Sequence, residues 1–310
     1  MISFEHVSKR YGALNALQDV TFTVPKGQVM GLLGQNGAGK TTMMNIMTGC
    51  LAPTSGRVSI GGNDLLLKPR EAKRMIGYLP EAVPVYSEMT VRAYLIFACE
   101  LKDVEKRAIA EHVENVAEKT GLSDVLDRKI GNLSKGYRQR AGVAQALCGT
   151  PEVIVLDEPT AGLDPKQNSE MRQLILSLAG EHTILFSSHI LSEVQAVCDR
   201  VIILHHGRII CDSALHELQN EEHRLRVVID CREEKILPAL RQLQSVRRVE
   251  SEKNADPDVT QAVLTAENNG LVERELFTLL SALQIPLLRL SPVEDSLENV
   301  FLRATMDETV

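Results

Sequence analysis

Hydrophobic residues follow two patterns along the first part of the chain. Residues 2–7 (ISFEHV) and 19–24 (DVTFTV) alternate apolar and polar positions, which predicts antiparallel strands with one buried face. The run QVMGLLG (28–34) is almost continuously apolar and ends in glycine, a pattern typical of a strand buried on both faces. Three later apolar runs are of the same kind, at residues 153–156, 183–188 and 200–206.

A helical pattern separates these apolar runs. It extends over residues 90–119, and Thr90 is placed to cap its first turn. Buried strands that alternate with helices predict an α/β layered domain with a parallel sheet.

The pattern changes after about residue 220. Strands are predicted at residues 225–231, 245–251, 259–266 and 286–291, and helices at 233–244 and 270–284. The order β-α-β-β-α-β is that of a ferredoxin-like unit, followed by a last helix at about 296–305. We therefore divide the chain into an N-terminal domain (1–220) and an accessory α+β domain (221–310). The accessory domain contains neither a glycine fingerprint nor clustered acids, so its default role is packing or dimerisation.

Composition narrows the class of protein. The chain has 310 residues, of which 44% are hydrophobic and 24% charged, which suits a packed core rather than a disordered chain. The formal net charge of −7 argues against nucleic acid as the main partner. No stretch approaches the roughly 20 apolar residues of a membrane helix, and the first residues lack the apolar core of a signal peptide. We therefore expect a cytosolic protein.

Cysteine and histidine give no strong metal signal. The six cysteines are widely separated and form no C-x-x-C pair, so buried free thiols are expected rather than a metal or disulfide role. His205 and His206 lie between an apolar run and Gly207, which favours a turn at a strand end over a metal site.

The strongest chemical signal is the segment GQNGAGKT, which matches G-x-x-x-x-G-K-[ST] in full. It follows a predicted buried strand and enters a helix, as a phosphate-binding loop requires. Backbone N–H groups of such a loop surround nucleotide phosphates, the lysine neutralises them, and the first threonine offers a hydroxyl to Mg²⁺. The candidate nucleotide-binding residues are Gly34, Gln35, Asn36, Gly37, Ala38, Gly39, Lys40, Thr41 and Thr42.

Two acids end the apolar strand VIVLDEPT (153–160). Asp157 and Glu158 are thereby placed at the carboxyl end of a strand, where open α/β sheets bind ligands. Beside a phosphate-binding loop, we expect Asp157 to hold Mg²⁺ and Glu158 to accept a proton from the attacking water. An acidic turn without chemistry is the alternative.

A second potential anion site occurs in LSKGYRQR (133–140). Ser134 has the position of a helix cap, and glycine and basic residues surround it. Free N–H groups and the helix dipole favour an anion at such an end. Taken alone, the segment could also be an ordinary capped basic helix.

Together these motifs resemble the ATP-binding subunit of an ABC transporter over nearly the whole chain. The resemblance implies a P-loop ABC ATPase domain with a mixed sheet core, an antiparallel β edge and a helical subdomain at about 82–145. It also implies that two subunits pair head to tail, so that the signature of one caps the ATP held by the other. The signature residues are then Leu133, Ser134, Lys135, Gly136 and Tyr137.

The resemblance implies roles for three further residues. Tyr11 has the position of the aromatic side chain that stacks on adenine, and Asp164 that of the acid which communicates across the dimer. His189 matches the switch histidine that contacts the γ-phosphate. Taken singly, these residues would be a tyrosine near a turn, an acid before a helix and a structural histidine.

Two departures from the family pattern stand out. The usual signature is similar to LSGGQ, whereas Lys135 and Tyr137 occupy its third and fifth positions here; Ser134 and Gly136 are retained. The segment IGYLPE (76–81) ends in Glu81 where the family usually has glutamine. Glu81 can still ligate Mg²⁺, but it does so as a charged group.

Within the family, IGYLPE, LSKGYRQR and SLENVFLRAT (296–305) resemble the ABC-2-type exporters. The implied partners are membrane permease subunits and a second ATPase subunit, in a homodimer or a heterodimer, at the inner face of the cell membrane. The segment 82–100, which includes Tyr86, Met89, Tyr94 and Phe97, is the expected docking surface, with the alternative that most of these residues are simply core. The alternative function is a soluble ABC ATPase that acts on a macromolecular complex.

Overall fold

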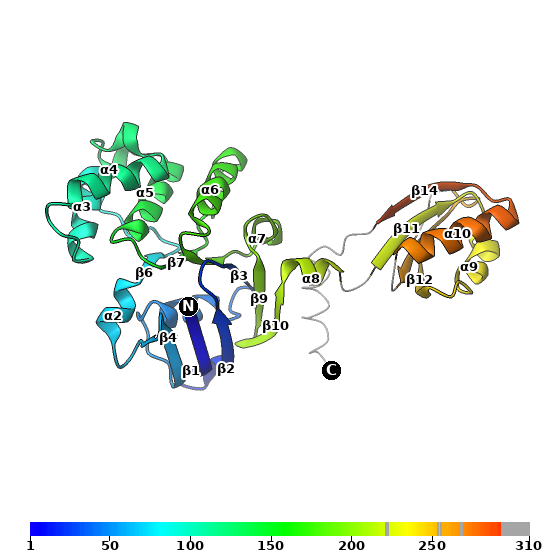
Figure 1. Cartoon of the computed structure of the whole chain (residues 1–310), viewed down its shortest axis with the longest axis horizontal. Coiled ribbons are helices and arrows are strands. Elements are labelled where there is room, and N and C mark those ends of the chain that lie inside the picture. The colour runs from blue at the N-terminus through cyan, green and yellow to red at the C-terminus, as the bar shows by residue number, and fades with distance from the viewer. Residues whose placement is uncertain (221–222, 253, 255, 267–268, 293–310) are drawn as a thin grey trace. The chain divides into compact units, whose positions relative to one another are not determined.

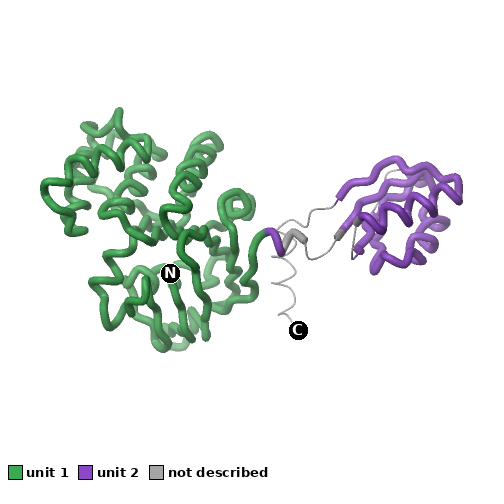
Figure 2. The backbone as a smooth tube through the Cα atoms, in the orientation of Figure 1, with its two compact units in different colours: residues 1–215, 304–310 green, residues 216–303 purple. Residues whose placement is uncertain are grey.

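The computed structural model describes residues 1–220, 223–252, 254, 256–266 and 269–292. The chain forms two compact units, the first covering residues 1–215 and the second beginning at His216 (Figures 1 and 2). The expected last helix, with its motif SLENVFLRAT (296–305), lies outside the described residues.

A six-stranded sheet forms the centre of the first unit, in the order β10-β9-β3-β8-β7-β6. All neighbours in it are parallel except β10 and β9. Every residue of β3, β7 and β8 is buried, as their continuous apolar runs predict. The strands are β3 (Val29–Leu33), β6 (Ile76–Leu79), β7 (Val153–Asp157), β8 (Thr183–Ser187), β9 (Arg200–His205) and β10 (Arg208–Ala214).

A four-stranded antiparallel sheet, β2-β1-β4-β5, forms the second layer of this unit. One hydrophobic core joins side chains from both sheets, and within it Phe4 and Phe22 stack with their ring centres 4.6 Å apart. The two alternating stretches near the N-terminus are therefore antiparallel partners, as predicted. The strands are β1 (Ile2–Tyr11), β2 (Leu14–Val24), β4 (Ser55–Ile60) and β5 (Asn63–Asp64).

Helices surround these sheets, and α3, α4 and α5 form a lobe of their own (Figure 1). The prediction of a single helical stretch at 90–119 is wrong, because the helix is interrupted between α3 and α4, where Asp103 has a φ of 57°. Thr90 does cap α3, since its hydroxyl accepts the Ala93 N–H. The helices of this unit are α1 (Lys40–Met47), α2 (Pro69–Arg74), α3 (Val91–Leu101), α4 (Ile109–Thr120), α5 (Lys135–Leu147), α6 (Pro165–Leu178) and α7 (Leu191–Val197), and α8 (Leu215–Asn220) begins at its last residue and continues into the second unit.

The second unit has the ferredoxin-like topology that the sequence predicts. Its four-stranded antiparallel sheet has the order β12-β13-β11-β14, and two helices complete the β-α-β-β-α-β succession. The first helix stops at Leu240, short of the predicted 244. The elements are β11 (His223–Ile229), α9 (Glu233–Leu240), β12 (Val246–Glu252), β13 (Thr260–Ala266), α10 (Asn269–Leu283) and β14 (Leu287–Pro292).

Membrane and cysteine expectations can be compared with the described part of the chain. Among its helices, none combines the length and apolar composition that crossing a bilayer requires. All six cysteines are free thiols, as expected. Only Cys99, Cys148 and Cys198 are buried, and Cys50 is exposed, so the expectation of burial holds for half of them.

The contact between β6 and α5 generates a stability prediction. A Cβ atom added at Gly77 would lie 1.9 Å from the carbonyl oxygen of Ala146, so only glycine permits this approach of two backbones. We expect Gly77→Ala to lower the free energy of unfolding by about 2–3 kcal/mol, because backbone cannot move aside as a side chain can. The matched control is Gly180→Ala, where φ is +86° but no atom lies within 4 Å.

The control should lower the free energy of unfolding by only about 1 kcal/mol, through backbone strain alone. Thermal denaturation of the purified variants measures the difference. Equal losses in the two variants would show that the β6–α5 contact does not limit stability.

Candidate nucleotide-binding site

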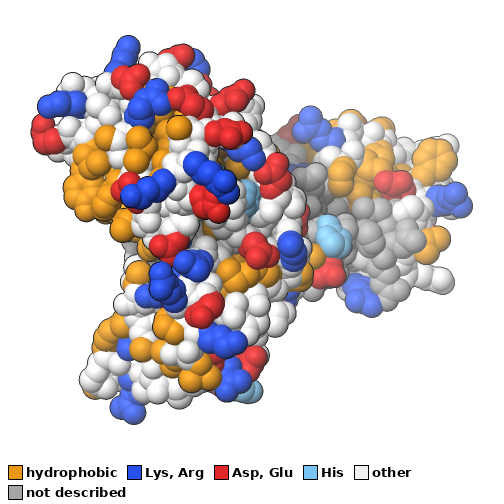
Figure 3. Space-filling view, turned by 60° about the vertical axis from the view of Figure 1, so that its left-hand side comes forward, with side chains coloured by type: hydrophobic (Ala, Val, Ile, Leu, Met, Phe, Trp, Pro, Cys, Tyr) orange, Lys and Arg blue, Asp and Glu red, His pale blue; other side chains and the backbone are white. Residues whose placement is uncertain are grey.

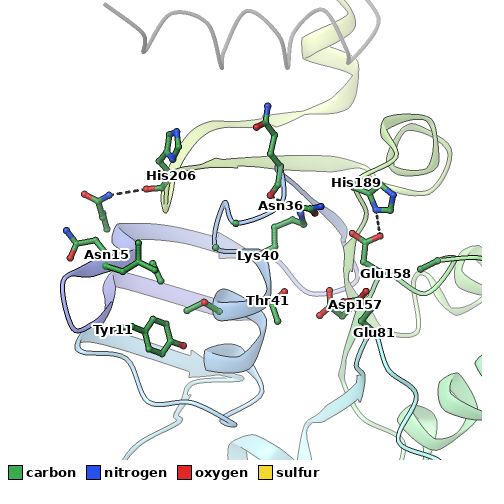
Figure 4. Close-up of a pocket in the computed structure, with 18 of the residues that line it drawn as sticks. Tyr11, Asn15, Asn36, Lys40, Thr41, Glu81, Asp157, Glu158, His189 and His206 are labelled. Atoms are coloured by element: carbon green, nitrogen blue, oxygen red, sulfur yellow. Dashed lines mark hydrogen bonds and ion pairs between the residues drawn. The ribbon is translucent and has the colours of Figure 1, made fainter.

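The phosphate-binding loop connects the buried strand β3 to helix α1 (Figure 4). Gly37 and Gly39 have φ angles of 83° and 110°, which a residue with a side chain adopts only under strain. A Cβ atom at Gly39 would also lie 2.6 Å from the carbonyl oxygen of Ala16. The glycines of the motif are therefore required by backbone conformation and by close packing.

Lys40 folds back over its own loop. Its Nζ donates to the carbonyl oxygens of Gly34, at 2.6 Å, and Gln35, at 3.3 Å. Burial lowers the pKa of the Lys40 ammonium, and the carboxylates of Glu158 and Asp157 oppose this shift. The lysine is thus a desolvated cation beside acids, ready to exchange carbonyl partners for phosphate oxygens.

Asp157 is the last residue of β7 and Glu158 follows it, and both lie beside the phosphate-binding loop (Figure 4). The neighbouring strand β8 supplies Ser187, whose hydroxyl donates to Asp157 Oδ1 at 2.6 Å and accepts the Glu158 N–H at 3.0 Å. Burial raises the pKa of the Asp157 carboxyl, more than the Ser187 hydrogen bond lowers it. Glu158 has a φ of 49°, a strained conformation for a residue with a side chain.

His189 contacts Glu158 directly. Nδ1 of His189 lies 2.7 Å from Glu158 Oε2, and this contact joins the chain after β8 to the chain after β7 (Figure 4). The imidazole is largely exposed, whereas the glutamate side chain is only 12% exposed. The Glu158 carboxylate and the His189 imidazole therefore line the cavity as a directly contacting pair.

These residues line one cavity of about 680 Å³, which is large enough for a nucleotide. Of the ten predicted nucleotide-binding residues, Gly34 and Ala38 do not line it: Ala38 is buried in the core, and Gly34 packs against the Leu204 carbonyl. The predicted residues that do line the cavity are Tyr11, Gln35, Asn36, Gly37, Gly39, Lys40, Thr41, Thr42, Glu81, Asp157, Glu158 and His189.

The cavity also contains residues that the sequence did not assign to it. Asn15, Gln18 and His206 line it, and the Gln18 amide donates to the His206 carbonyl at 3.0 Å. His206 and Gly207 both have positive φ in the tight turn between β9 and β10, which confirms the predicted strand-end turn. Their place in the site depends on the sheet order, which no local pattern reveals.

The signature residues lie elsewhere, in a second cavity of about 420 Å³. Ser134, Gly136 and Tyr137 line it, whereas Leu133 is buried and Lys135 is not among the lining residues. The Ser134 hydroxyl accepts the Tyr137 N–H at 3.4 Å, so Ser134 is the cap of α5, as predicted.

Asp164 lines this second cavity rather than the first. Its carboxylate accepts the Gln167 N–H at 2.8 Å and so caps α6, which begins at Pro165. Across the cavity, the side chain of Gln167 also packs on the backbone of Gly136. The structure therefore brings Asp164 and the signature together in one chain.

A buried carboxylate that the sequence did not reveal connects the loops of the site. Glu193, on α7, accepts hydrogen bonds from the hydroxyls of Thr160, at 2.6 Å, and Ser188, at 2.8 Å, and from the Asn168 amide at 3.4 Å. Thr160 follows Glu158 by two residues, and Ser188 precedes His189. Glu193 therefore fixes the two loops that hold the acid and the imidazole.

Fold and site together define a P-loop nucleotide-binding protein, and comparison with known proteins identifies its family. A family model described as ABC transporter matches residues 17–161. The chain is 39% identical over 228 residues to the ABC transporter ATP-binding protein NatA of Bacillus subtilis (strain 168), covering 72% of this chain and 93% of NatA. It is 36% identical over 222 residues to the Nod factor export ATP-binding protein I of Burkholderia orbicola (strain AU 1054), covering 71% of this chain and 73% of that protein.

Solved structures agree with this assignment. The dimeric structure of a bacterial ABC transporter cassette matches the chain with a TM-score of 0.63 at 25% identity, over 69% of this chain and 99% of that one. The chain belongs to the ABC transporter family, and it is an ATP-binding subunit of that family. The resemblance seen in its motifs is confirmed, and so is the ABC ATPase fold.

The Glu193 network generates a prediction about catalysis. Glu193→Ala removes the acceptor of two buried hydroxyls and frees the loops that hold Glu158 and His189. We expect kcat for ATP hydrolysis to fall about tenfold or more, equivalent to about 1.4 kcal/mol of barrier, while the Kd for ATP changes less than threefold. Steady-state kinetics and titration with a fluorescent ATP analogue measure the two quantities.

The matched control is Glu152→Ala, which removes a half-exposed carboxylate from the start of β7 and should leave kcat unchanged. If Glu193→Ala weakened ATP binding and kcat in equal proportion, the network would support the fold as a whole rather than the reacting groups.

The raised pKa of Asp157 generates a prediction about stability and pH. The pKa of the Asp157 carboxyl is higher in the folded chain than its value of 3.8 in the unfolded chain, so the folded chain binds this proton more tightly. The carboxyl therefore destabilises the fold increasingly as the pH rises from the unfolded pKa to the folded pKa. Asp157→Asn removes the buried charge and keeps an oxygen for Ser187. We therefore expect the nucleotide-free variant to melt at a higher temperature than the wild type at pH 7, with the gain shrinking toward pH 4.

Scanning calorimetry at several pH values measures this difference. A variant that is less stable than the wild type at pH 7 would contradict the claim that Asp157 is destabilising when the site holds no ligand.

Proposed function

We propose that this chain hydrolyses ATP at the cavity of its P-loop and, paired with a second cassette, drives export through separate membrane subunits. One observation supports the paired arrangement above all. The P-loop and its acids line one cavity, whereas the signature residues of the same chain line another, so each cavity holds half of the expected site. The dimeric solved cassette to which the chain is similar supports it as well.

In this proposal the P-loop binds the phosphates and Tyr11 holds the base. Lys40 exchanges its bonds to the Gly34 and Gln35 carbonyls for phosphate oxygens, and the loop N–H groups supply further donors. Tyr11 is 47% exposed where it lines the cavity, so one ring face can stack on adenine.

The residues present fit a Mg²⁺ ion. Thr41, Asp157 and Glu81 all line the cavity and offer oxygen atoms, the donors that Mg²⁺ prefers. Burial raises the pKa of the Asp157 carboxyl, as expected of an acid whose charge a cation would stabilise. When bound, the ion neutralises charge on the phosphates. Glu81 adds a negative charge where the family usually has a neutral amide.

Glu158 acts as the general base in this scheme, and His189 orients it. The Glu158 N–H donates to the Ser187 hydroxyl, and Glu158 Oε2 contacts His189 Nδ1. These two contacts hold the carboxylate toward the phosphate position, where it accepts a proton from the attacking water. His189 is exposed enough to reach the γ-phosphate in the same complex.

The second half of the site comes from the partner cassette, either a second copy of this chain or a related subunit. Ser134 caps α5 and, with Gly136, lines the second cavity, so the N-terminus of α5 can bind the γ-phosphate held by the partner. The accessory domain, placed by the sequence at 221–310, serves dimerisation or regulation in this proposal.

The membrane partner is a permease bound at the inner face of the membrane. The segment 82–100 supports a docking role, because Tyr86 is 56% exposed and packs edge-on against Tyr94 and Phe97. Tyr94 itself is buried and belongs to the core, whereas Met89 and Phe97 are half-buried. Hydrophobic side chains gather on the lobe of α3, α4 and α5 in Figure 3.

The test uses Glu158→Gln, which keeps the shape of the side chain and removes its basicity. We expect ATP binding to persist, hydrolysis to fall about 100-fold or more, and a closed dimer to accumulate with ATP and Mg²⁺. A tagged variant is then used to capture partners from gently solubilised native membranes, and mass spectrometry identifies them. A stoichiometric polytopic membrane protein is the expected partner.

The matched control is Glu152→Gln, which changes a half-exposed acid that lines neither cavity and should leave hydrolysis intact. Full turnover by Glu158→Gln would exclude Glu158 as the base. Capture of ribosomes or of soluble proteins alone would favour the non-transport ABC ATPase instead.

A further inference from the structure

Three potential metal ligands meet inside the lobe of α3, α4 and α5. Cys99 comes from α3, His112 from α4, and Cys148 directly follows α5. One ligand atom from each residue lies within 4.8 Å of the other two. Both thiols are buried, and the imidazole is half-buried. The three helices pack directly on one another, so the cluster lies within a single packed body (Figure 1).

We propose that Cys99, His112 and Cys148 form a binding site for a thiophilic divalent cation, with Zn²⁺ as the ion that this donor set fits. Thiolate sulfur and imidazole nitrogen are the ligands that Zn²⁺ prefers in proteins. Two thiolates balance the charge of the ion, so the filled centre is neutral and suits a buried place. The two thiol protons pass to the solvent when the ion binds.

The spacing of the cluster suits such an ion after a small closure. Bonds of about 2.3 Å to sulfur and about 2.0–2.1 Å to nitrogen place tetrahedral ligand atoms roughly 3.4–3.8 Å apart. The ligand atoms are therefore within about 1 Å of coordinating distance. Three protein ligands leave the fourth position of a tetrahedral ion for a water molecule.

The imidazole of His112 has one unprotonated nitrogen. Nε2 of His112 accepts the Gly149 N–H at 3.2 Å, so this nitrogen carries no proton. Gly149 directly follows Cys148, and hence the lone pair points toward the backbone that carries the second thiol. A metal ion at Nε2 would replace one backbone hydrogen bond, and the ring would keep its proton on Nδ1.

The contacts of the Cys148 thiol within the chain are few and weak. In the present structure the Cys148 thiol lies 3.5 Å from the Ala144 carbonyl oxygen and 3.7 Å from that of Leu95, which are weak interactions. Lys102, whose ammonium group donates to the Ile76 and Lys73 carbonyls, is a nearby cation. A bound ion would cross-link α3, α4 and α5, and α5 carries the signature at its first turn.

Cobalt titration tests the site, because thiolate-bound Co²⁺ has a charge-transfer absorption that oxygen ligands do not produce. The full chain is purified, reduced and freed of metal, then titrated with Co²⁺ and afterwards with Zn²⁺. We expect one Co²⁺ per chain with this absorption, and its displacement by Zn²⁺. Cys99→Ser, Cys148→Ser and His112→Gln should each weaken Zn²⁺ binding about tenfold or more.

The matched control is Cys198→Ser, which removes another buried thiol, at the end of α7. It should bind Zn²⁺ as the wild type does, and ATP binding by every variant verifies that each is folded. Because His112 is half-buried, its variant tests the site even if a cysteine variant fails to fold. A reduced wild-type chain without the charge-transfer absorption, or Zn²⁺ affinity unchanged in His112→Gln, would overturn the proposal.

Discussion

The hydrogen bond from the Ser187 hydroxyl to Asp157 joins the ends of two neighbouring strands, and the geometry of the site depends on it. Strand β8 lies between β3 and β7, so the loop that follows β3 and the acids that end β7 are separated by one strand only. Since these strands are parallel, their carboxyl ends meet at one edge of the sheet. Ser187 also accepts the Glu158 N–H and thereby fixes the backbone where it adopts a strained conformation.

Electrostatics at this edge oppose the stability of the fold when no ligand is present. Burial lowers the pKa of the Lys40 ammonium and raises that of the Asp157 carboxyl, and their mutual attraction offsets both shifts only in part. The strained φ of Glu158 adds to this cost. A bound nucleotide would offset this cost, which explains why the chain keeps a buried lysine beside buried acids rather than an apolar core.

The sequence reveals those parts of the molecule that local patterns determine. The P-loop, the acids after the apolar strand, the cap Ser134 and the ferredoxin-like succession all follow from neighbouring residues. Strand order and burial do not, so His206 in the cavity, Glu193 beneath the loops and the meeting of Cys99 with Cys148 required the folded chain. Gly34 and Ala38 belong to the matched motif but do not line the cavity, and their packing on residues distant in the sequence is likewise not visible in a local pattern.

The two cavities are separate, so a structural change at one can affect the other only through the contacts between them. Within one chain, a series of contacts links them: the signature backbone at Gly136 packs on Gln167 of α6, and the chain before α6 contains Thr160. Thr160 shares the carboxylate of Glu193 with Ser188, the neighbour of His189. In the proposed dimer, a shift of the signature backbone would therefore reach the loops that hold Glu158 through packing contacts and hydrogen bonds. Gly136, Thr160 and Ser188 are buried, whereas Gln167 is half-buried and Asp164 is exposed, so the link depends on the hydrogen bond by which Asp164 holds the Gln167 N–H.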